Sequence, residues 1–130
     1  SMDDYVNCPH SRNTEVRLED ILKHPELEVL AKSDEAGVLL VLNEYGSGSQ
    51  VFIQGHPEYD RMTLSNEYHR DVAKGLNPAL PKNYFTDNNP FSRPVLCWRN
   101  FSNTLYANWL NFYVYQNTPY ELSNNFDWVI

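Results

Sequence analysis

An unbroken apolar run predicts a buried strand near the middle of the chain. Residues 38–42 are all apolar, and Gly37 and Asn43 bound them. A continuous run of this kind is typical of a strand that is covered on both faces. Residues 50–54 follow across a turn rich in glycine and serine, so the two segments are expected to pair as a hairpin. A short helical turn and a further strand at residues 27–31 are expected before them.

Two later segments show the signals of helices. Residues 63–74 are predicted to form one, with Thr63 as the N-cap and Gly75 as the stop. In residues 101–116 the apolar side chains recur at helical spacing, and Pro119 is expected to end this helix. The resulting broad apolar stripe must be covered by another part of the protein, and it consists of Phe101, Leu105, Trp109, Phe112 and Tyr113.

The remaining segments are expected to be irregular. Residues 3–17 are polar, and residues 77–97 contain four prolines and several asparagines. A loop as long as the second is usually functional or packs on another part of the protein. A chain of 130 residues suits at most one domain, so residues 1–130 are expected to belong to a single domain.

Charge and cysteine content narrow the possible partners and compartment. Lys and Arg total 10 against 17 Asp and Glu, a net charge of -7, which argues against nucleic acid or an anionic membrane as partner. The apolar runs are too short for a transmembrane helix, and Ser1-Met2-Asp3-Asp4 does not resemble a signal peptide. Cys8 and Cys97 form neither a CxxC pair nor a disulfide framework. We therefore expect a cytoplasmic protein.

His56 and Glu58 are the candidates for acid–base chemistry, because they flank Pro57 directly after a predicted strand. Strand ends are where α/β proteins place catalytic side chains. A histidine can accept a proton near neutral pH, and a neighbouring carboxylate fixes its tautomer. Spacing alone equally fits a solvated histidine beside a surface acid. The four histidines and Cys8 show no recognised ligand spacing, so no metal site is expected.

The segment Gly55-His56-Pro57-Glu58-Tyr59-Asp60 resembles a characteristic segment of the homoserine O-succinyltransferase and O-acetyltransferase family. The resemblance continues in order along nearly the whole chain, through residues 9–17, 27–38, 67–76, 81–85, 98–99, 108–116 and 118–120. It implies an α/β fold like that of class I glutamine amidotransferases, a flavodoxin-like architecture. The chain would hold the hairpin strands, the base loop and the carboxy-terminal helices of that fold.

The resemblance also implies roles for individual residues. His56 would be the general base, and Glu58 would be its carboxylate partner. Arg70 would bind the carboxylate of the acceptor amino acid, which suits a guanidinium fork. Ser11 would lie near the acceptor. Glu67 shares a helix face with Arg70, so it would orient Arg70 or line the pocket; the alternative for this pair is a surface salt bridge.

By resemblance, the activity is the transfer of an acetyl or succinyl group from coenzyme A to homoserine in methionine biosynthesis. The acyl-CoA is a co-substrate, and no cofactor is expected. The family's nucleophilic cysteine lies in an earlier half that this chain lacks, while Cys8 and Cys97 are expected to be inert small hydrophobes. The chain alone is therefore expected to be inactive. The missing amino-terminal half or a second copy would be its protein partner.

Three alternatives stay open at this point. Serine could replace homoserine as the acceptor, because one methylene contributes only about 1–3 kcal/mol of discrimination. The chain could instead be a non-catalytic assembly module whose strand edges and aromatic helix face bind a partner. A generic cysteine–histidine amidotransferase is the third, although the carboxy-terminal helix resembles only the acyltransferases.

Overall fold

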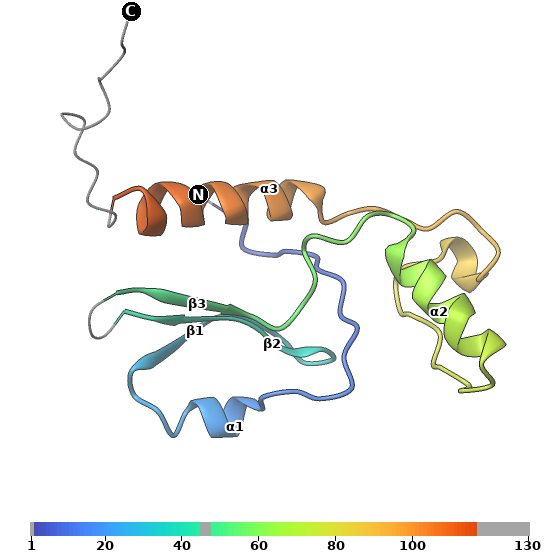
Figure 1. Cartoon of the computed structure of the whole chain (residues 1–130), viewed down its shortest axis with the longest axis horizontal. Coiled ribbons are helices and arrows are strands. Elements are labelled where there is room, and N and C mark those ends of the chain that lie inside the picture. The colour runs from blue at the N-terminus through green and yellow to red at the C-terminus, as the bar shows by residue number, and fades with distance from the viewer. Residues whose placement is uncertain (1, 45–47, 117–130) are drawn as a thin grey trace, which may run out of the picture.

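The fold is α/β, with a three-stranded sheet, a long helix over it and a smaller helical unit at one end (Figure 1). A computed structural model describes residues 2–44 and 48–116. Within those residues no helix is long and apolar enough to cross a membrane. In chain order the elements are α1 (Leu18–Ile21), β1 (Leu27–Ser33), β2 (Gly37–Asn43), β3 (Gln50–Ile53), α2 (Thr63–Ala73), the 3₁₀ turn η1 (Thr86–Asn88), α3 (Arg99–Asn108) and the π-helix η2 (Trp109–Val114).

The sheet is antiparallel in the order β1-β2-β3, so β2 is its central strand. Residues 38–42 of β2 are all buried because both faces of the strand are covered. Leu39 and Leu40 pack with residues of α3, and the other face packs on α1. The predicted buried strand, its hairpin with β3 and the preceding strand are therefore confirmed.

Helix α2 begins at Thr63, as predicted, but Thr63 is not its N-cap. Met62 holds that position, and the Thr63 hydroxyl instead accepts a hydrogen bond from the backbone N–H of Asp60 at 3.2 Å. The reason is local competition, since a threonine hydroxyl can serve a preceding turn as readily as a helix end. The helix ends just before Gly75, whose φ of +73° is the left-handed conformation expected at a helix stop.

The long loop after α2 packs back onto that helix, which confirms one of the two roles expected for it. Tyr84, Phe85 and Trp98 form a buried cluster there. The Tyr84 hydroxyl accepts a hydrogen bond from the backbone N–H of Ser65, which lies in α2, at 3.0 Å. Together α2, this loop and the cluster form the unit seen on the right of Figure 1.

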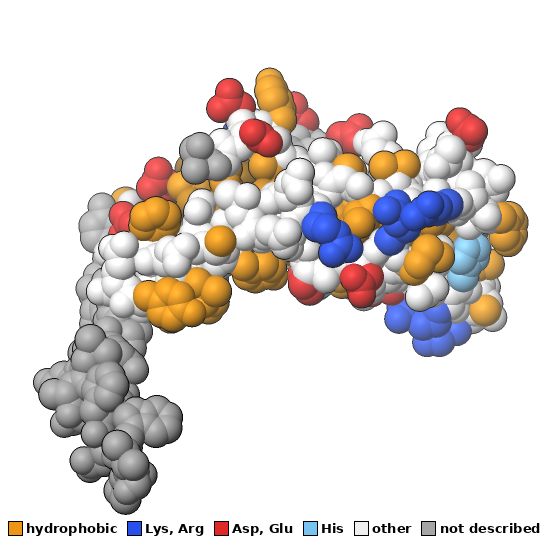
Figure 2. Space-filling model, turned by 90° about the horizontal axis from the view of Figure 1, so that it is seen from above, with side chains coloured by type: hydrophobic (Ala, Val, Ile, Leu, Met, Phe, Trp, Pro, Cys, Tyr) orange, Lys and Arg blue, Asp and Glu red, His pale blue; other side chains and the backbone are white. Residues whose placement is uncertain are grey.

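The last helix differs from the prediction in its second half. Helix α3 begins at Arg99, and from Trp109 the chain continues as the π-helix η2. A π-helix has more residues per turn, so apolar positions spaced three or four apart no longer line up. Phe101 and Leu105 are buried against the sheet, whereas Trp109 and Phe112 stay 41% and 58% exposed. Figure 2 shows apolar side chains on the surface at this end of the molecule. Pro119 lies outside the described residues.

Candidate active site

The loop after β3, residues 54–62 and called the base loop below, is held against the amino-terminal segment by close backbone packing. The backbone N–H of His56 donates to the carbonyl of Pro9 at 2.7 Å. A Cβ added to Gly55 would come within 2.8 Å of both Cys8 Sγ and Leu39 Cδ1. Only glycine lets the two segments approach this closely. Gly55 therefore fixes where the backbone of His56 lies.

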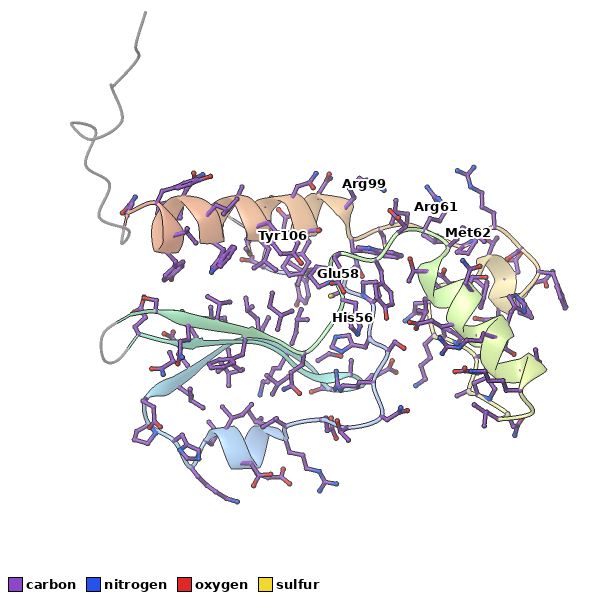
Figure 3. The ribbon with its side chains drawn as sticks, viewed as in Figure 1. His56, Glu58, Arg61, Met62, Arg99 and Tyr106 are labelled. Atoms are coloured by element: carbon purple, nitrogen blue, oxygen red, sulfur yellow. The ribbon has the colours of Figure 1, made fainter. Side chains whose placement is uncertain are left out.

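His56 and Glu58, the pair predicted from the sequence, contact each other directly. The distance from His56 Nδ1 to Glu58 Oε1 is 2.8 Å. Both lie on the connection between the sheet and α2, in the middle of the molecule (Figure 3). His56 Nε2 lies 3.1 Å from the carbonyl oxygen of Ser11. Glu58 orients the ring through Nδ1, and the Ser11 carbonyl at Nε2 is itself an acceptor. Nε2 could therefore take a proton from a substrate hydroxyl only when that hydroxyl replaces the Ser11 carbonyl beside it.

The chain contains a second His-Pro-Glu tripeptide, at residues 24–26, and a comparison shows what is particular to the one at residues 56–58. His24 Nδ1 and Glu26 Oε1 are 3.3 Å apart, and the His24 side chain is 61% exposed. The His56 side chain is 33% exposed, and it contacts the Ser11 carbonyl at its edge and the ring of Tyr59 on its face. His24 thus matches the interpretation as a solvated histidine beside a surface acid, whereas His56 does not, although Glu58 is itself 54% exposed.

Ser11 and Glu67 meet at the same site, although 56 positions separate them in the chain. The Ser11 hydroxyl donates to Glu67 Oε2 at 2.7 Å. Glu67 Oε1 accepts a second hydrogen bond, from the Tyr59 hydroxyl, also at 2.7 Å. Both oxygens of this carboxylate are therefore held. The structure thus brings four of the five predicted residues, His56, Glu58, Ser11 and Glu67, into one cluster.

Tyr59 belongs to this cluster, and the sequence reasoning did not assign it a role. Its ring is stacked on the imidazole of His56, with the centroids 4.3 Å apart and the planes at 12°. Burial, and next the neighbouring Glu67, raise the pKa of Tyr59 to about 12, so its hydroxyl stays a hydrogen-bond donor at neutral pH. The only sequence signal for a role of Tyr59 was that an aromatic residue lies three positions after the candidate base His56.

Arg70, the fifth predicted residue, lies at the exposed edge of the cluster. Its Nε donates to Asp71 Oδ1 at 2.8 Å, and 55% of its side chain is exposed. The pKa of Arg70 is raised chiefly by Asp71 and further by the negative charge of Glu67. Arg70 thus lies within electrostatic reach of Glu67, but in the described part of the chain its ion pair is with Asp71. The expected alternative, a surface salt bridge between Glu67 and Arg70, is not formed there.

Arg12 ties the segment that carries Ser11 to the sheet, another role that sequence reasoning missed. Its guanidinium donates to the carbonyl of Gln54 at 3.3 Å and also to that of Ala36. It also contacts Nδ1 of His10. Burial, and then the charge of Arg12, lower the pKa of His10, so this imidazole is neutral and accepts from Arg12. The network holds Ser11 beside the base loop.

The two cysteines have different surroundings, and Cys8 is not an activated nucleophile. Burial raises the pKa of Cys8 to about 12, and the thiolate rather than the thiol is the reactive form. Cys97 is exposed and lies in the segment before α3. In the part of the chain that the structure describes, no group of three or more His, Cys, Asp or Glu side chains could hold a metal ion.

Comparison with known proteins identifies close relatives. The sequence model of the family described as homoserine O-succinyltransferase matches residues 1–120. The homoserine O-acetyltransferase of Agathobacter rectalis is 57% identical over 123 residues, which are 95% of this chain and 39% of the relative. That of Lachnoclostridium phytofermentans is 57% identical over 92% of this chain and 39% of the relative. The homoserine O-succinyltransferase of Shewanella putrefaciens is 51% identical over 94% and 38%. The chain therefore spans about two fifths of these relatives.

Proposed function

Because the chain belongs to the homoserine O-succinyltransferase family, we propose that it is the carboxy-terminal part of a homoserine O-acyltransferase of methionine biosynthesis. In this proposal the chain supplies the base of the enzyme and the acceptor site. One observation carries the assignment, namely the 2.8 Å contact between His56 Nδ1 and Glu58 Oε1 beside the cluster of Ser11 and Glu67. Such a pair orients an imidazole for general-base work.

The proposed reaction is a two-step acyl transfer. A cysteine outside this chain takes an acetyl or succinyl group from the coenzyme A thioester, and coenzyme A leaves. The homoserine hydroxyl then attacks the thioester carbonyl of the acyl-enzyme while His56 Nε2 takes the hydroxyl proton. The new ester forms as the bond to the cysteine sulfur breaks, and the sulfur leaves as a thiolate that is reprotonated. Glu58 stabilises the imidazolium during this step.

The acceptor would lie between His56 and the exposed end of Arg70. A guanidinium fork matches the two oxygens of the acceptor's α-carboxylate, and Arg70 would exchange Asp71 for that partner. Glu67 would receive the ammonium group, and Ser11, which donates to it, would form part of the wall of the site. The chain has a net charge of -7, yet Lys and Arg side chains gather at the α2 end of the face seen in Figure 2. This local positive charge favours anionic substrates.

The rest of the proposed enzyme would complete a fold like that of class I glutamine amidotransferases. The relatives are more than twice as long as the segment that this chain matches. The exposed apolar residues at the end of the long helix, Trp109 and Phe112, suit burial against the remaining part of the enzyme or a second copy. A cytoplasmic location accords with coenzyme A chemistry and stays part of the proposal.

The test is to change the base in the full-length protein that carries this chain. We expect His56→Ala to lower kcat for coenzyme A release by about 10²–10⁴-fold, the usual contribution of a general base. His24→Ala is the matched control, because it removes the histidine of the exposed His-Pro-Glu tripeptide, and it should leave kcat unchanged. Coenzyme A release by His56→Ala at the wild-type rate would refute the proposed function.

A further inference from the structure

We propose that Tyr59 is a positioning residue that couples the base His56 to the acceptor-site carboxylate of Glu67. The inference rests on the proposed function and extends it to a residue outside the predicted set. The Tyr59 ring lies parallel to the imidazole, with 4.3 Å between centroids, and its hydroxyl donates to Glu67 Oε1 at 2.7 Å. One side chain thus contacts both the proton acceptor and the carboxylate.

Ser11 closes this pair of contacts into a ring of four residues. Its hydroxyl donates to Glu67 Oε2 at 2.7 Å, and its carbonyl oxygen lies 3.1 Å from His56 Nε2. The four residues come from the amino-terminal segment, the base loop and α2. Because both oxygens of Glu67 are held, its carboxylate has one orientation. An acceptor that binds at Glu67 therefore meets an imidazole whose direction is already set, and its hydroxyl would take the place of the Ser11 carbonyl at Nε2 for the proton transfer.

Tyr59 is itself fixed from the opposite side. The indole Nε1 of Trp98 donates to the carbonyl of Tyr59 at 2.9 Å, and Trp98 is only 4% exposed. Tyr59 also packs against the buried cluster that Trp98 forms with Tyr84 and Phe85. The backbone of Tyr59 therefore cannot shift without disturbing that core. The loop after α2 has in this way a part in holding the base, although it contributes no group to the reaction.

Two substitutions separate the functions of the ring and of the hydroxyl. Tyr59→Phe keeps the stacked ring and removes the hydrogen bond to Glu67. In the full-length protein we expect this variant to raise KM for homoserine about 10-fold, as loss of a hydrogen bond to a charged group does, with kcat within about two-fold of wild type. Tyr59→Leu also removes the stack, so kcat should fall about 10-fold as well.

The control is Tyr68→Phe, which removes a hydroxyl from a tyrosine whose ring packs on His69 and Phe85 instead. It should leave both kinetic constants unchanged. If Tyr59 were only structural, its variants would reduce the amount of active enzyme, so kcat would fall and KM would stay constant. That outcome, or wild-type kinetics in Tyr59→Phe, would overturn the inference.

A failure of the inference about Tyr59 can be told apart from a failure of the proposed function. If His56→Ala is inactive while Tyr59→Phe behaves as wild type, only the role of Tyr59 is wrong. If His56→Ala retains full activity, the base assignment fails whatever Tyr59 does. Thermal unfolding of each variant shows whether it is folded, and Tyr59→Phe decides the question even if Tyr59→Leu does not fold.

Discussion

Glu58 and Glu67 are both carboxylates of the site, but they contact different partners. Glu58 contacts Nδ1 of the imidazole, and 54% of its side chain is exposed. Glu67 instead accepts hydrogen bonds from two hydroxyl groups, those of Ser11 and Tyr59. A carboxylate on Nδ1 orients a base and stabilises its protonated form, whereas one held by neutral donors keeps its charge for a substrate. The two should therefore respond differently to loss of charge.

Glu58→Gln tests this difference because it keeps the shape of the side chain and removes the charge. We expect kcat in the full-length protein to fall about 10²–10⁴-fold, since the imidazolium loses its partner and the tautomer is no longer fixed. KM for homoserine should change little. Glu26→Gln, in the exposed His-Pro-Glu tripeptide, is the control and should have wild-type kinetics. A Glu58→Gln variant with wild-type kcat would show that the contact is only a surface pair.

At the scale of elements, the junction between β3 and the base loop determines where the imidazole lies. The backbone N–H of Gln54 donates to the carbonyl of Leu39 at 2.8 Å, and that of His56 donates to the carbonyl of Pro9 at 2.7 Å. Between them Gly55 lies against Cys8 and Leu39 with no room for a side chain. The loop is thus fastened to the sheet on one side of the glycine and to the amino-terminal segment on the other.

We expect Gly55→Ala to disturb both stability and activity. Its Cβ would overlap Cys8 Sγ and Leu39 Cδ1, each at 2.8 Å, and overpacking of this kind costs about 1–3 kcal/mol. A displaced loop would also move His56 and lower kcat. Thermal unfolding and coenzyme A release measure the two effects. Gly48→Ala is the control, because nothing lies within 4 Å of its added Cβ; equal behaviour of the two variants would contradict the packing argument.

The elements that could be predicted are those whose signals are local. The apolar run of β2 and the turn before β3 specify a hairpin by themselves. The π-helix after Asn108 was missed, because i→i+5 bonding is rare and the apolar spacing there fits an ordinary helix. Thr63 was misassigned as a cap because its sequence context does not show that Asp60 uses its hydroxyl.

The difference between local and distant contacts also explains which parts of the candidate site could be predicted from the sequence. His56 and Glu58 are two positions apart, so their contact follows from the loop itself. The same His-Pro-Glu tripeptide occurs at residues 24–26, so it could not identify His56 and Glu58 as the candidate pair by itself. The family resemblance of the surrounding segments identified them. The contact of Ser11 with Glu67 depends on the whole fold, so its geometry could not be derived from spacing. Tyr59 was visible in the motif, but its role depends on where α2 places Glu67.

At the scale of the whole molecule, the described residues contain the proposed base and acceptor site, and Cys8, the cysteine nearest to them, is not activated. Burial holds the pKa of Cys8 at about 12. Because the buried site disfavours the charged form, Cys8 stays a neutral thiol as the pH rises from 7 to well above 9. Cys97 is exposed and lies in the segment before α3 rather than in the base loop. We therefore expect neither sulfur to form the acyl-enzyme that the proposed reaction needs.

The chain of 130 residues on its own should accordingly release no coenzyme A above background. The measurement uses acetyl-CoA or succinyl-CoA with homoserine at pH 8, where an ordinary cysteine with a pKa of about 8.5 would already be partly ionised. Alkylation under the same conditions should label Cys97 and spare Cys8 until the protein is unfolded. Coenzyme A release that disappears in Cys8→Ser would contradict this account, because it would mean that His56 can activate this partly buried thiol. Release that persists in both Cys8→Ser and Cys97→Ser would instead show that the transfer needs no cysteine nucleophile at all.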